Sequence, residues 1–224
     1  MVWKRARNPE QKEQRRLALL DAAARLFEQH PFDEISLNAI ARAANISKAN
    51  IYRYFESREE LFLHLMLEDS REWIDAFVPE LSQLNSSEDD GAVVHALVTS
   101  LAARHRFITL LSVLSSVLER NITVDNVIRF KMALREQVQR VVAAVGAALP
   151  SLSDDDVMQL LSATIHLTGG VWQAAHPSPA VNEALKHPEL NPARVDFEQQ
   201  MQRYLIIFLR GLRVKEPKQA KNME

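Results

Sequence analysis

Polar, basic and aromatic side chains are concentrated between residues 47 and 54. The segment SKANIYRY holds a lysine, an arginine, an asparagine and two tyrosines. Lys48 can donate to guanine O6 and N7 or to a phosphate, and Asn50 can hydrogen-bond a base edge or the DNA backbone. Ala49 is small enough for close approach and can contact a thymine methyl group. Contacts to phosphate are expected from the other three polar side chains, Tyr52, Arg53 and Tyr54.

Two short helices separated by a tight turn are predicted to position this segment. Apolar residues recur within 37–44 at i, i+3, i+4 and i+7, and Ser36 is a natural N-cap for that helix. Asn45 tolerates a positive φ and can end the helix in a turn. Ser47 can then cap a second helix, in which Ile51 and Phe55 share the inner face. The polar side chains of the segment would lie on its outer face.

This arrangement is a helix-turn-helix, in which the second helix can enter the major groove of DNA. We predict the motif at residues 36–55 and its recognition helix at Ser47–Tyr54. Backbone N–H groups at the helix starts Ser36 and Ser57 would point at phosphate oxygens, and Arg58 follows directly. The predicted DNA-binding residues are Ser36, Asn38, Ser47, Lys48, Ala49, Asn50, Tyr52, Arg53, Tyr54, Ser57 and Arg58.

Helical spacing continues along the chain, and strand signals are nearly missing. Patterns of Ser-x-x-acid predict helix starts at Ser57–Glu60 and Ser153–Asp156. An early helix is expected to end before Pro31, which disfavours helix at the preceding residue. Its predicted inner face consists of Leu17, Leu20, Ala24 and Phe27. We expect an all-α protein of about nine helices, with an N-terminal three-helix helix-turn-helix domain and a larger C-terminal helical domain.

Composition argues against most enzyme chemistry. The 224 residues include no cysteine and five glycines. Thiolate nucleophiles and cysteine zinc sites are therefore excluded, and the glycines lack the spacing of a phosphate-binding loop. We expect no catalytic residues, no metal site, no cofactor and no enzymatic activity. Residues 157–182 carry no Asp, Glu, Lys or Arg, but their Gln and His side chains favour a buried helix over a membrane span.

The N-terminal end is basic, although the whole chain has a formal net charge of −2. The first sixteen residues contain six lysines and arginines and two glutamates. Such an arm suggests a polyanionic partner, and it is equally typical of a solvated tail.

The run LFEQHPFDEISLNAIARAANISKANIYRYFESREELF resembles the N-terminal domain of TetR-type transcriptional regulators. The resemblance covers residues 13–73. Pro31, Asn45 and Ala49 stand where the family usually has glycine, and Arg58 stands where it usually has lysine. Asn45 tolerates the positive φ that glycine allows, and Arg58 keeps the positive charge of lysine. Ala49 adds a methyl group on the side that faces the groove. The resemblance is carried by Phe27, Phe32, Ile40-Ala41, Ala44, Ile46-Ser47, Tyr52, Phe55, Ser57 and Glu60-Leu61.

The resemblance implies a homodimer that binds a palindromic double-stranded DNA operator, usually as a repressor. The domains would be a DNA-binding domain at 13–73 and an effector-binding and dimerisation domain at 74–213, with flexible tails at 1–12 and 214–224. A small, largely apolar effector would change operator binding. The expected location is the bacterial cytoplasm, at the nucleoid when DNA is bound, with no membrane partner.

Helices at about 154–175 and 194–213 are the predicted dimer helices, because both are apolar over more than one face. Ordinary core helices of a monomer would show the same pattern. Aromatic side chains with a few polar groups are typical of small-molecule sites, although residues of these kinds more often belong to the core. The candidate effector residues are Trp73, Phe77, Phe107, Phe130, His166 and Trp172.

Two other functions remain open on the sequence. A helical module that binds another protein could use the same exposed side chains without any DNA. An enzyme with a buried helical active site could bring together residues that are distant in the sequence, although no acid/base pair or nucleophile–base spacing supports it.

Overall fold

The computed structural model describes residues 9–84, 88–114, 118 and 122–214. Within these ranges the chain forms ten α-helices and two short 3-10 helices, and it contains no strand. The all-α prediction is confirmed, with ten helices where about nine were expected. None of the described helices combines the length and hydropathy that a membrane span requires.

The helices form two compact units. Met1–Trp73 and Arg104–Gln137 make up the first, and Ile74–Ala103 and Val138–Glu224 make up the second. One change of unit falls between residues 73 and 74, and residues 104–137 group with the N-terminal part. Residues 9–12, expected in a flexible tail, are helical. Residues 1–8 and 215–224 of the predicted tails lie outside the described part.

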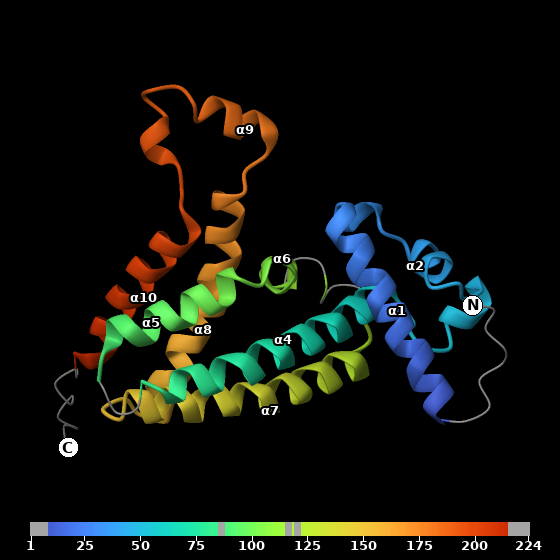
Figure 1. Ribbon diagram of the computed structural model, residues 1–224, viewed down its shortest axis with the longest axis horizontal. Coiled ribbons are helices and arrows are strands. Elements are labelled where there is room, and N and C mark those ends of the chain that lie inside the picture. Colours follow the sequence, from blue (N-terminus) through green and yellow to red (C-terminus); the bar gives the residue numbers. More distant parts are fainter. Residues whose placement is uncertain (1–8, 85–87, 115–117, 119–121, 215–224) are drawn as a thin grey trace, which may run out of the picture. The chain divides into compact units, whose positions relative to one another are not determined.

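The first unit holds the predicted helix-turn-helix. In it α1 (Pro9–Gln29) packs against α2 (Leu37–Ala43), as Figure 1 shows. Helix α1 also contacts α6 (His105–Val113), and α2 contacts α3 (Lys48–Ile51). The chain enters the second unit through α4 and again through α7. The helices of the first unit are α1 (Pro9–Gln29), η1 (Phe32–Glu34), α2 (Leu37–Ala43), α3 (Lys48–Ile51), the first part of α4 (Arg58–Ser82), α6 (His105–Val113) and the first part of α7 (Val124–Ala148).

Three phenylalanines join the helices of this unit. The Phe62 ring of α4 lies 5.4 Å from the ring of Phe27 on α1 and 5.0 Å from the ring of Phe32 on η1. Phe62 is fully buried, and its contact with Phe32 is edge-to-face. Such aromatic pairs contribute about 0.5–1.5 kcal/mol beyond the area that they bury. The cluster therefore fixes the segment that leads into α2.

The inner face of α1 differs from the prediction. Leu20 and Ala24 are buried as expected, but Leu17 is 48% exposed and Leu19 is fully buried. The run LALLDAAA carries apolar residues on more than one face, so its spacing alone does not select the buried side. Small side chains at 22–24 allow close packing there, and this packing turns Leu17 outward.

The second unit contains the rest of α4 and α7 together with α5 (Asp90–Ala102), α8 (Asp154–Ala175), α9 (Pro179–Ala184), η3 (Asn191–Ala193) and α10 (Phe197–Arg213). Helix α10 packs against both α5 and α8 (Figure 1). Its buried side chains, spaced by four residues, are Phe197, Met201, Leu205 and Leu209. The start of α8 is confirmed as a capping box, in which Ser153 and Asp156 satisfy each other's backbone N–H groups.

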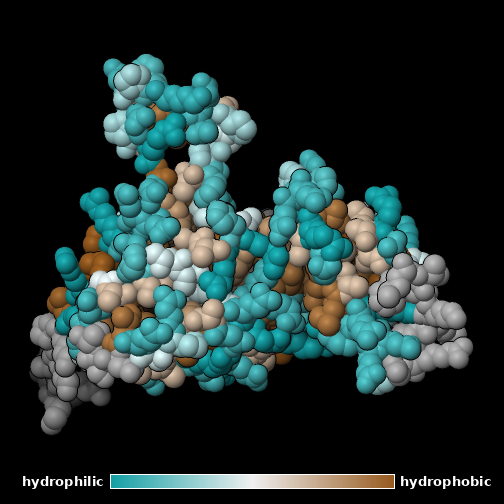
Figure 2. Space-filling view, in the orientation of Figure 1, coloured by the Kyte–Doolittle hydropathy of each residue, from teal (hydrophilic) through white to brown (hydrophobic). Residues whose placement is uncertain are grey.

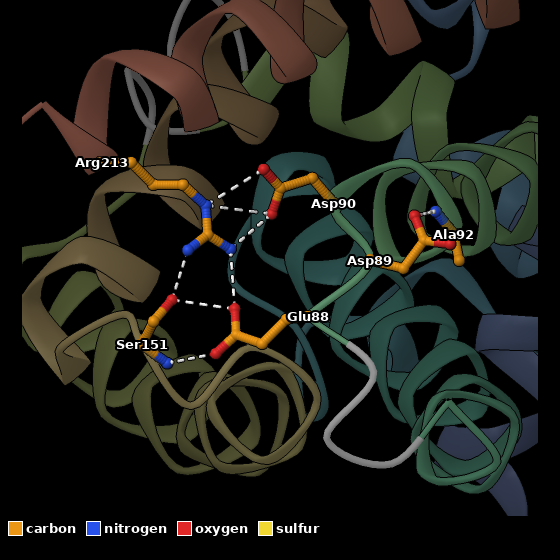
Figure 3. A network of polar contacts seen from close by, with 6 residues as sticks. All are labelled: Glu88, Asp89, Asp90, Ala92, Ser151 and Arg213. Atoms are coloured by element: carbon orange, nitrogen blue, oxygen red, sulfur yellow. Dashed lines mark hydrogen bonds and ion pairs between the residues drawn. The ribbon is translucent and has the colours of Figure 1, made fainter.

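Arg213 joins three segments at the end of α10 (Figure 3). Its guanidinium donates to Asp90 at the start of α5, with Nη2–Oδ1 at 2.6 Å, and to Glu88 Oε2 at 2.9 Å. It also donates to Ser151 in the α7–α8 connection. Glu88 has a φ of 50°, a conformation uncommon for a non-glycine residue. Hydrogen bonds from Ser151 and Arg213 hold the pKa of Glu88 below its ordinary value.

Replacing Arg213 is expected to weaken the second unit. Arg213→Ala should lower the free energy of unfolding by about 1 kcal/mol, because charged hydrogen bonds are lost but the network is partly solvated. Urea denaturation at low and high salt measures this, and the difference should shrink at high salt. Arg210→Ala, at an exposed arginine in the last turn of α10, is the matched control. Equal stability of the two variants would contradict the assigned role.

Candidate nucleic-acid interface

The turn between α2 and α3 depends on one residue with a positive φ. Asn45 has a φ of 55°, as its sequence position predicted. The N–H of Asn45 donates to the Arg42 carbonyl at 3.1 Å, and the N–H of Ile46 donates to the Ala41 carbonyl at 2.8 Å. This pair of bonds is the Schellman arrangement, which satisfies carbonyl groups at the end of a helix. Ile46 is then buried beneath the turn.

Regular helix in α3 is shorter than predicted. It spans Lys48–Ile51, and the N–H groups of Arg53 and Tyr54 bond to the carbonyls of Asn50 and Ile51, three residues back. The expected helix Ser47–Tyr54 is therefore one α-helical turn that tightens at its end. Ser47 occupies the N-cap position, but its hydroxyl makes no capping hydrogen bond. Its carbonyl accepts from Asn50 N at 2.8 Å.

The two faces of this segment separate as the spacing predicts. Ile51 and Phe55 are buried, with 0% and 1% of their surface exposed. Tyr52 is 51% exposed, although a tyrosine could readily have been packed. Asn50 and Tyr54 are half-buried at the edge of the segment. The predicted contact residues that are exposed are Ser36, Asn38, Ser47, Lys48, Ala49, Tyr52 and Arg53.

The two flanking serines act as caps. Ser36 Oγ accepts from the N–H of Ala39 at 3.1 Å, and Ser57 Oγ accepts from the N–H of Glu60 at 3.0 Å. Glu60 Oε2 in turn accepts from the N–H of Glu56 at 2.6 Å, one residue earlier than a standard capping box would place it. Negative charge on Glu60 thus occupies the start of α4, where a phosphate was expected to bind.

Arg58 faces the protein. Its Nη1 donates to the carbonyl oxygens of Phe32 at 3.0 Å and Ile35 at 2.9 Å, and its Nη2 donates to Glu59 Oε1 at 3.0 Å. The guanidinium also lies 4.2 Å from the centre of the Phe32 ring. Arg58 therefore braces the segment that precedes α2, a role that the sequence did not indicate because the partners are more than twenty residues away.

Two further contacts within the first unit were not predicted. Asn126 of α7, which is buried, donates to Glu56 Oε2 at 3.3 Å, next to the end of the α3 segment. Arg106 of α6 donates to both oxygens of buried Asp69 on α4, with Nε–Oδ2 at 2.8 Å. These partners are separated by 70 and 37 residues in the sequence, so no local spacing could have revealed them.

His64 lies against the inner side of the α3 segment. Its ring is 5.6 Å from that of Phe55 in an edge-to-face contact. Burial disfavours the imidazolium, and nearby Arg16 adds repulsion, so the pKa of His64 lies below its ordinary value. Arg129 acts in the same direction, while Glu68 and Glu13 oppose it. The side chain is thus best accommodated as neutral imidazole.

The six predicted effector residues do not form one described site. Trp73 and Phe107 contact each other in the first unit, with ring centres 5.8 Å apart, and Phe130 is buried in the same unit. Phe77 and Trp172 are buried in the second unit. Trp172 packs on His176 and Phe197. His166 is exposed on α8, where Nδ1 lies 3.5 Å from Ser162 Oγ.

Sequence comparison identifies both parts of the chain. The model described as "Bacterial regulatory proteins, tetR family" matches residues 19–65, and the model described as "Tetracyclin repressor-like, C-terminal domain" matches residues 67–216. The chain belongs to the tetR family. The predicted family is thereby confirmed, and it is described as a family of bacterial regulatory proteins.

Curated relatives of this tetR-family chain match short stretches of it. The "Uncharacterized HTH-type transcriptional regulator Rv1255c" of Mycobacterium tuberculosis is 56% identical over 43 residues, 19% of this chain and 21% of the relative. "Uncharacterized HTH-type transcriptional regulator Rv1556" of the same organism is 36% identical over 58 residues, 26% of this chain and 29% of the relative. The chain thus spans less than a third of the length of these relatives.

Solved structures show the same fold over nearly the whole chain. The fatty acid degradation regulator FadR from Bacillus halodurans has a TM-score of 0.56 and 16% identity, covering 93% of this chain and 99% of that one. A TetR transcriptional regulator from Rhodococcus sp. RHA1 has a TM-score of 0.54 and 20% identity, covering 88% and 97%. At these identities the similarity establishes the fold alone.

Removing the Arg58 brace should destabilise the first unit without removing a DNA contact. Arg58→Ala is expected to lower the free energy of unfolding by about 2 kcal/mol, since the carbonyls of Phe32 and Ile35 lose a charged donor. Arg58→Lys should give an intermediate loss, because a lysine lacks the fork geometry. Denaturation curves measure both variants. A stability equal to that of the unmodified chain would contradict the brace.

Acid should destabilise the first unit through His64. A lowered pKa in the folded state means that the unfolded chain binds this proton more readily, so stability is intact above about pH 6.5 and falls below it. His64→Gln should flatten this fall by at most about 1.4 kcal/mol per pH unit. Denaturation at pH 7.5 and 5.5 measures the effect, with exposed His30→Gln as control. Identical pH dependence in all three proteins would refute the assignment.

Proposed function

We propose that this chain binds a palindromic operator as a homodimer and regulates transcription, most simply as a repressor, in response to a small molecule. One observation carries the proposal. The α3 segment buries Ile51 and Phe55 and exposes Lys48, Ala49 and Tyr52, which gives a small, basic and aromatic surface suited to a major groove. Bacterial cytoplasm, with its DNA, is the proposed place of action.

Base contacts are proposed for Lys48, Ala49 and Asn50, and phosphate contacts for Tyr52, Arg53 and Tyr54. Ser47 is exposed at the tip of the segment with a hydroxyl not used for capping, so it joins the phosphate contacts. Ser36 and Asn38, at the exposed start of α2, would contact the DNA backbone. Ser57 and Arg58 are proposed to position the segment, because they are half-buried and their polar atoms already bond within the protein.

Dimerisation is proposed through α8 and α10, in agreement with the expected ranges 154–175 and 194–213. Helix α10 buries one apolar stripe and exposes a second, formed by Tyr204, Ile207 and Gly211. A Cβ atom at Gly211, or at Gly170 of α8, would meet nothing within 4 Å. Packing within one subunit therefore does not require glycine there, whereas a second pair of helices could approach closely at these positions. Their cost to helix stability, about 1 kcal/mol each, would then be offset.

An effector site is proposed in the part of the chain that follows residue 65, where the second family model matches. The buried aromatic pair Trp73 and Phe107 offers apolar surface, as small-molecule sites commonly do. A ligand can alter operator affinity only if it binds one arrangement of the two DNA-binding domains better than another. We also propose that this effector is small and largely apolar.

Operator binding tests the proposal. Lys48→Ala combined with Tyr52→Ala should reduce affinity for the DNA upstream of the chain's own gene at least about 100-fold, because base and phosphate contacts are both lost. Fluorescence anisotropy measures this, with circular dichroism and sedimentation to verify fold and dimer. Affinity of the unmodified protein should also fall steeply with salt as counterions are released.

Arg135→Ala, which removes an exposed cation from α7, outside the proposed DNA and dimer surfaces, is the matched control and should bind normally. Full affinity in the double variant would reject the α3 segment as the reading element. Salt-independent binding, or no binding to any genomic fragment, would instead favour the protein-interaction module.

A further inference from the structure

The segment between α8 and α10 is ordered without any buried side chain. Residues 177–196, here called the α9 segment, include α9 and η3, yet each of them is exposed or at most half-buried. Figure 1 shows the segment extending beyond the ends of α8 and α10, on the side away from α5. Compact structure in a protein normally depends on burial of apolar surface. Within one subunit the α9 segment buries apolar surface only in part, at the half-buried Pro177, Leu185 and Val195.

Local interactions define the shape of this segment. Ser178 Oγ accepts from the N–H of Val181 at 3.4 Å and caps α9. Arg194, from beyond η3, reaches back to the Leu185 carbonyl at 3.2 Å and the Asn182 carbonyl at 3.4 Å. Four of the nine prolines of the chain lie here and restrict the backbone. The segment is thus pre-shaped, which lowers the entropy lost when it docks.

The surface chemistry of the α9 segment argues against DNA or a membrane as its partner. Its charges are nearly balanced, with three acidic and two basic side chains, and Lys186 already pairs with Glu183 at 2.5 Å. A polyanionic partner would require an excess of positive charge. Val181 and Leu190 are 49% and 47% exposed, so the segment offers two separate apolar anchors in a largely hydrophilic surface (Figure 2).

We infer that the α9 segment docks on a second copy of this chain and forms part of the homodimer interface, with Val181 and Leu190 as anchors. The inference rests on the proposed homodimer. The segment connects the last residue of α8 directly with the first of α10, so it continues from both helices whose outer faces are proposed to meet. In a two-fold dimer each subunit would hold the other in the same way.

The area that a stable homodimer must bury also favours a second copy of this chain as the partner of the α9 segment. Helix α10 has 17 residues and is therefore about 25 Å long. Helix α8 has 22 residues and is about 33 Å long, so the two helices, each about 10 Å wide, present about 600 Å² per subunit. Stable homodimers bury about 1,000 Å² or more per subunit. The α9 segment supplies further surface adjoining the same face.

Dimer dissociation constants test the inference. The full-length variant Val181→Asp with Leu190→Asp should raise the dissociation constant of the dimer at least about tenfold, measured by analytical ultracentrifugation. Gln139→Asp with Ala143→Asp introduces the same charges at exposed positions of α7 and should leave the constant unchanged. Ile207→Asp, in the exposed stripe of α10, should disrupt the dimer through the helix face itself.

A fluorescent label on the α9 segment measures its docking without introducing the charged Asp side chains of the first test. The chain contains no cysteine, so Val181→Cys provides a single thiol for an environment-sensitive dye. Its emission should shift to the blue as protein concentration passes through the dissociation constant, and it should not shift when Ile207→Asp is also present.

The outcomes separate this inference from the proposed function. A normal dimer in the Val181→Asp, Leu190→Asp variant, together with concentration-independent emission from the label, overturns the docking of the α9 segment and leaves the α8–α10 dimer standing. An unmodified protein that stays monomeric at all concentrations, with or without operator DNA, overturns both.

Discussion

A helix of four residues has no stability of its own, because its first hydrogen-bonded turn fixes more backbone freedom than one bond offsets. Helix α3 is such a helix. It exists because Ile51 and Phe55 are buried on one side and the Asn45 turn fixes its start on the other. The proposed reading surface is therefore the outer side of a small hydrophobic contact. Anything that loosens this contact also moves Lys48 and its neighbours.

The surroundings of α3 show how the fold maintains that contact. The Phe27–Phe32–Phe62 cluster and the Arg58 brace fix the chain before α2, and the capped start of α4 fixes the chain after Phe55. Asn126 attaches α7 to Glu56, next to the end of the segment. A change at the start of α7 would thus reach the α3 segment through one buried side chain. This is a physical route by which other parts of the first unit can influence the reading surface.

In the second unit, apolar side chains lie on two sides of one helix, α10. Helix α10 uses a four-residue spacing for the core of its own subunit and leaves Tyr204 and Ile207 exposed. The Arg213 network fixes the end of the same helix against α5 and the α7–α8 connection. A helix held firmly on one side, with a second apolar stripe on the other, suits a role in assembly. The same reasoning applies to the α9 segment, which has no buried side chain: its exposed Val181 and Leu190 also suit contact with a second subunit.

The sequence by itself determined the all-helical fold, the positive φ at Asn45, the caps at Ser36, Ser57 and Ser153, and the polar character of the exposed α3 face. These features depend on residues within about four positions of one another, so spacing and residue type are sufficient to predict them. Tertiary structure alone decided that Leu17 is exposed, that α3 is regular for only one turn and that Arg58 faces the protein. It also decided that Asn126 meets Glu56. For Arg58 and Asn126 the partners come from distant segments, so only packing decides which contacts form.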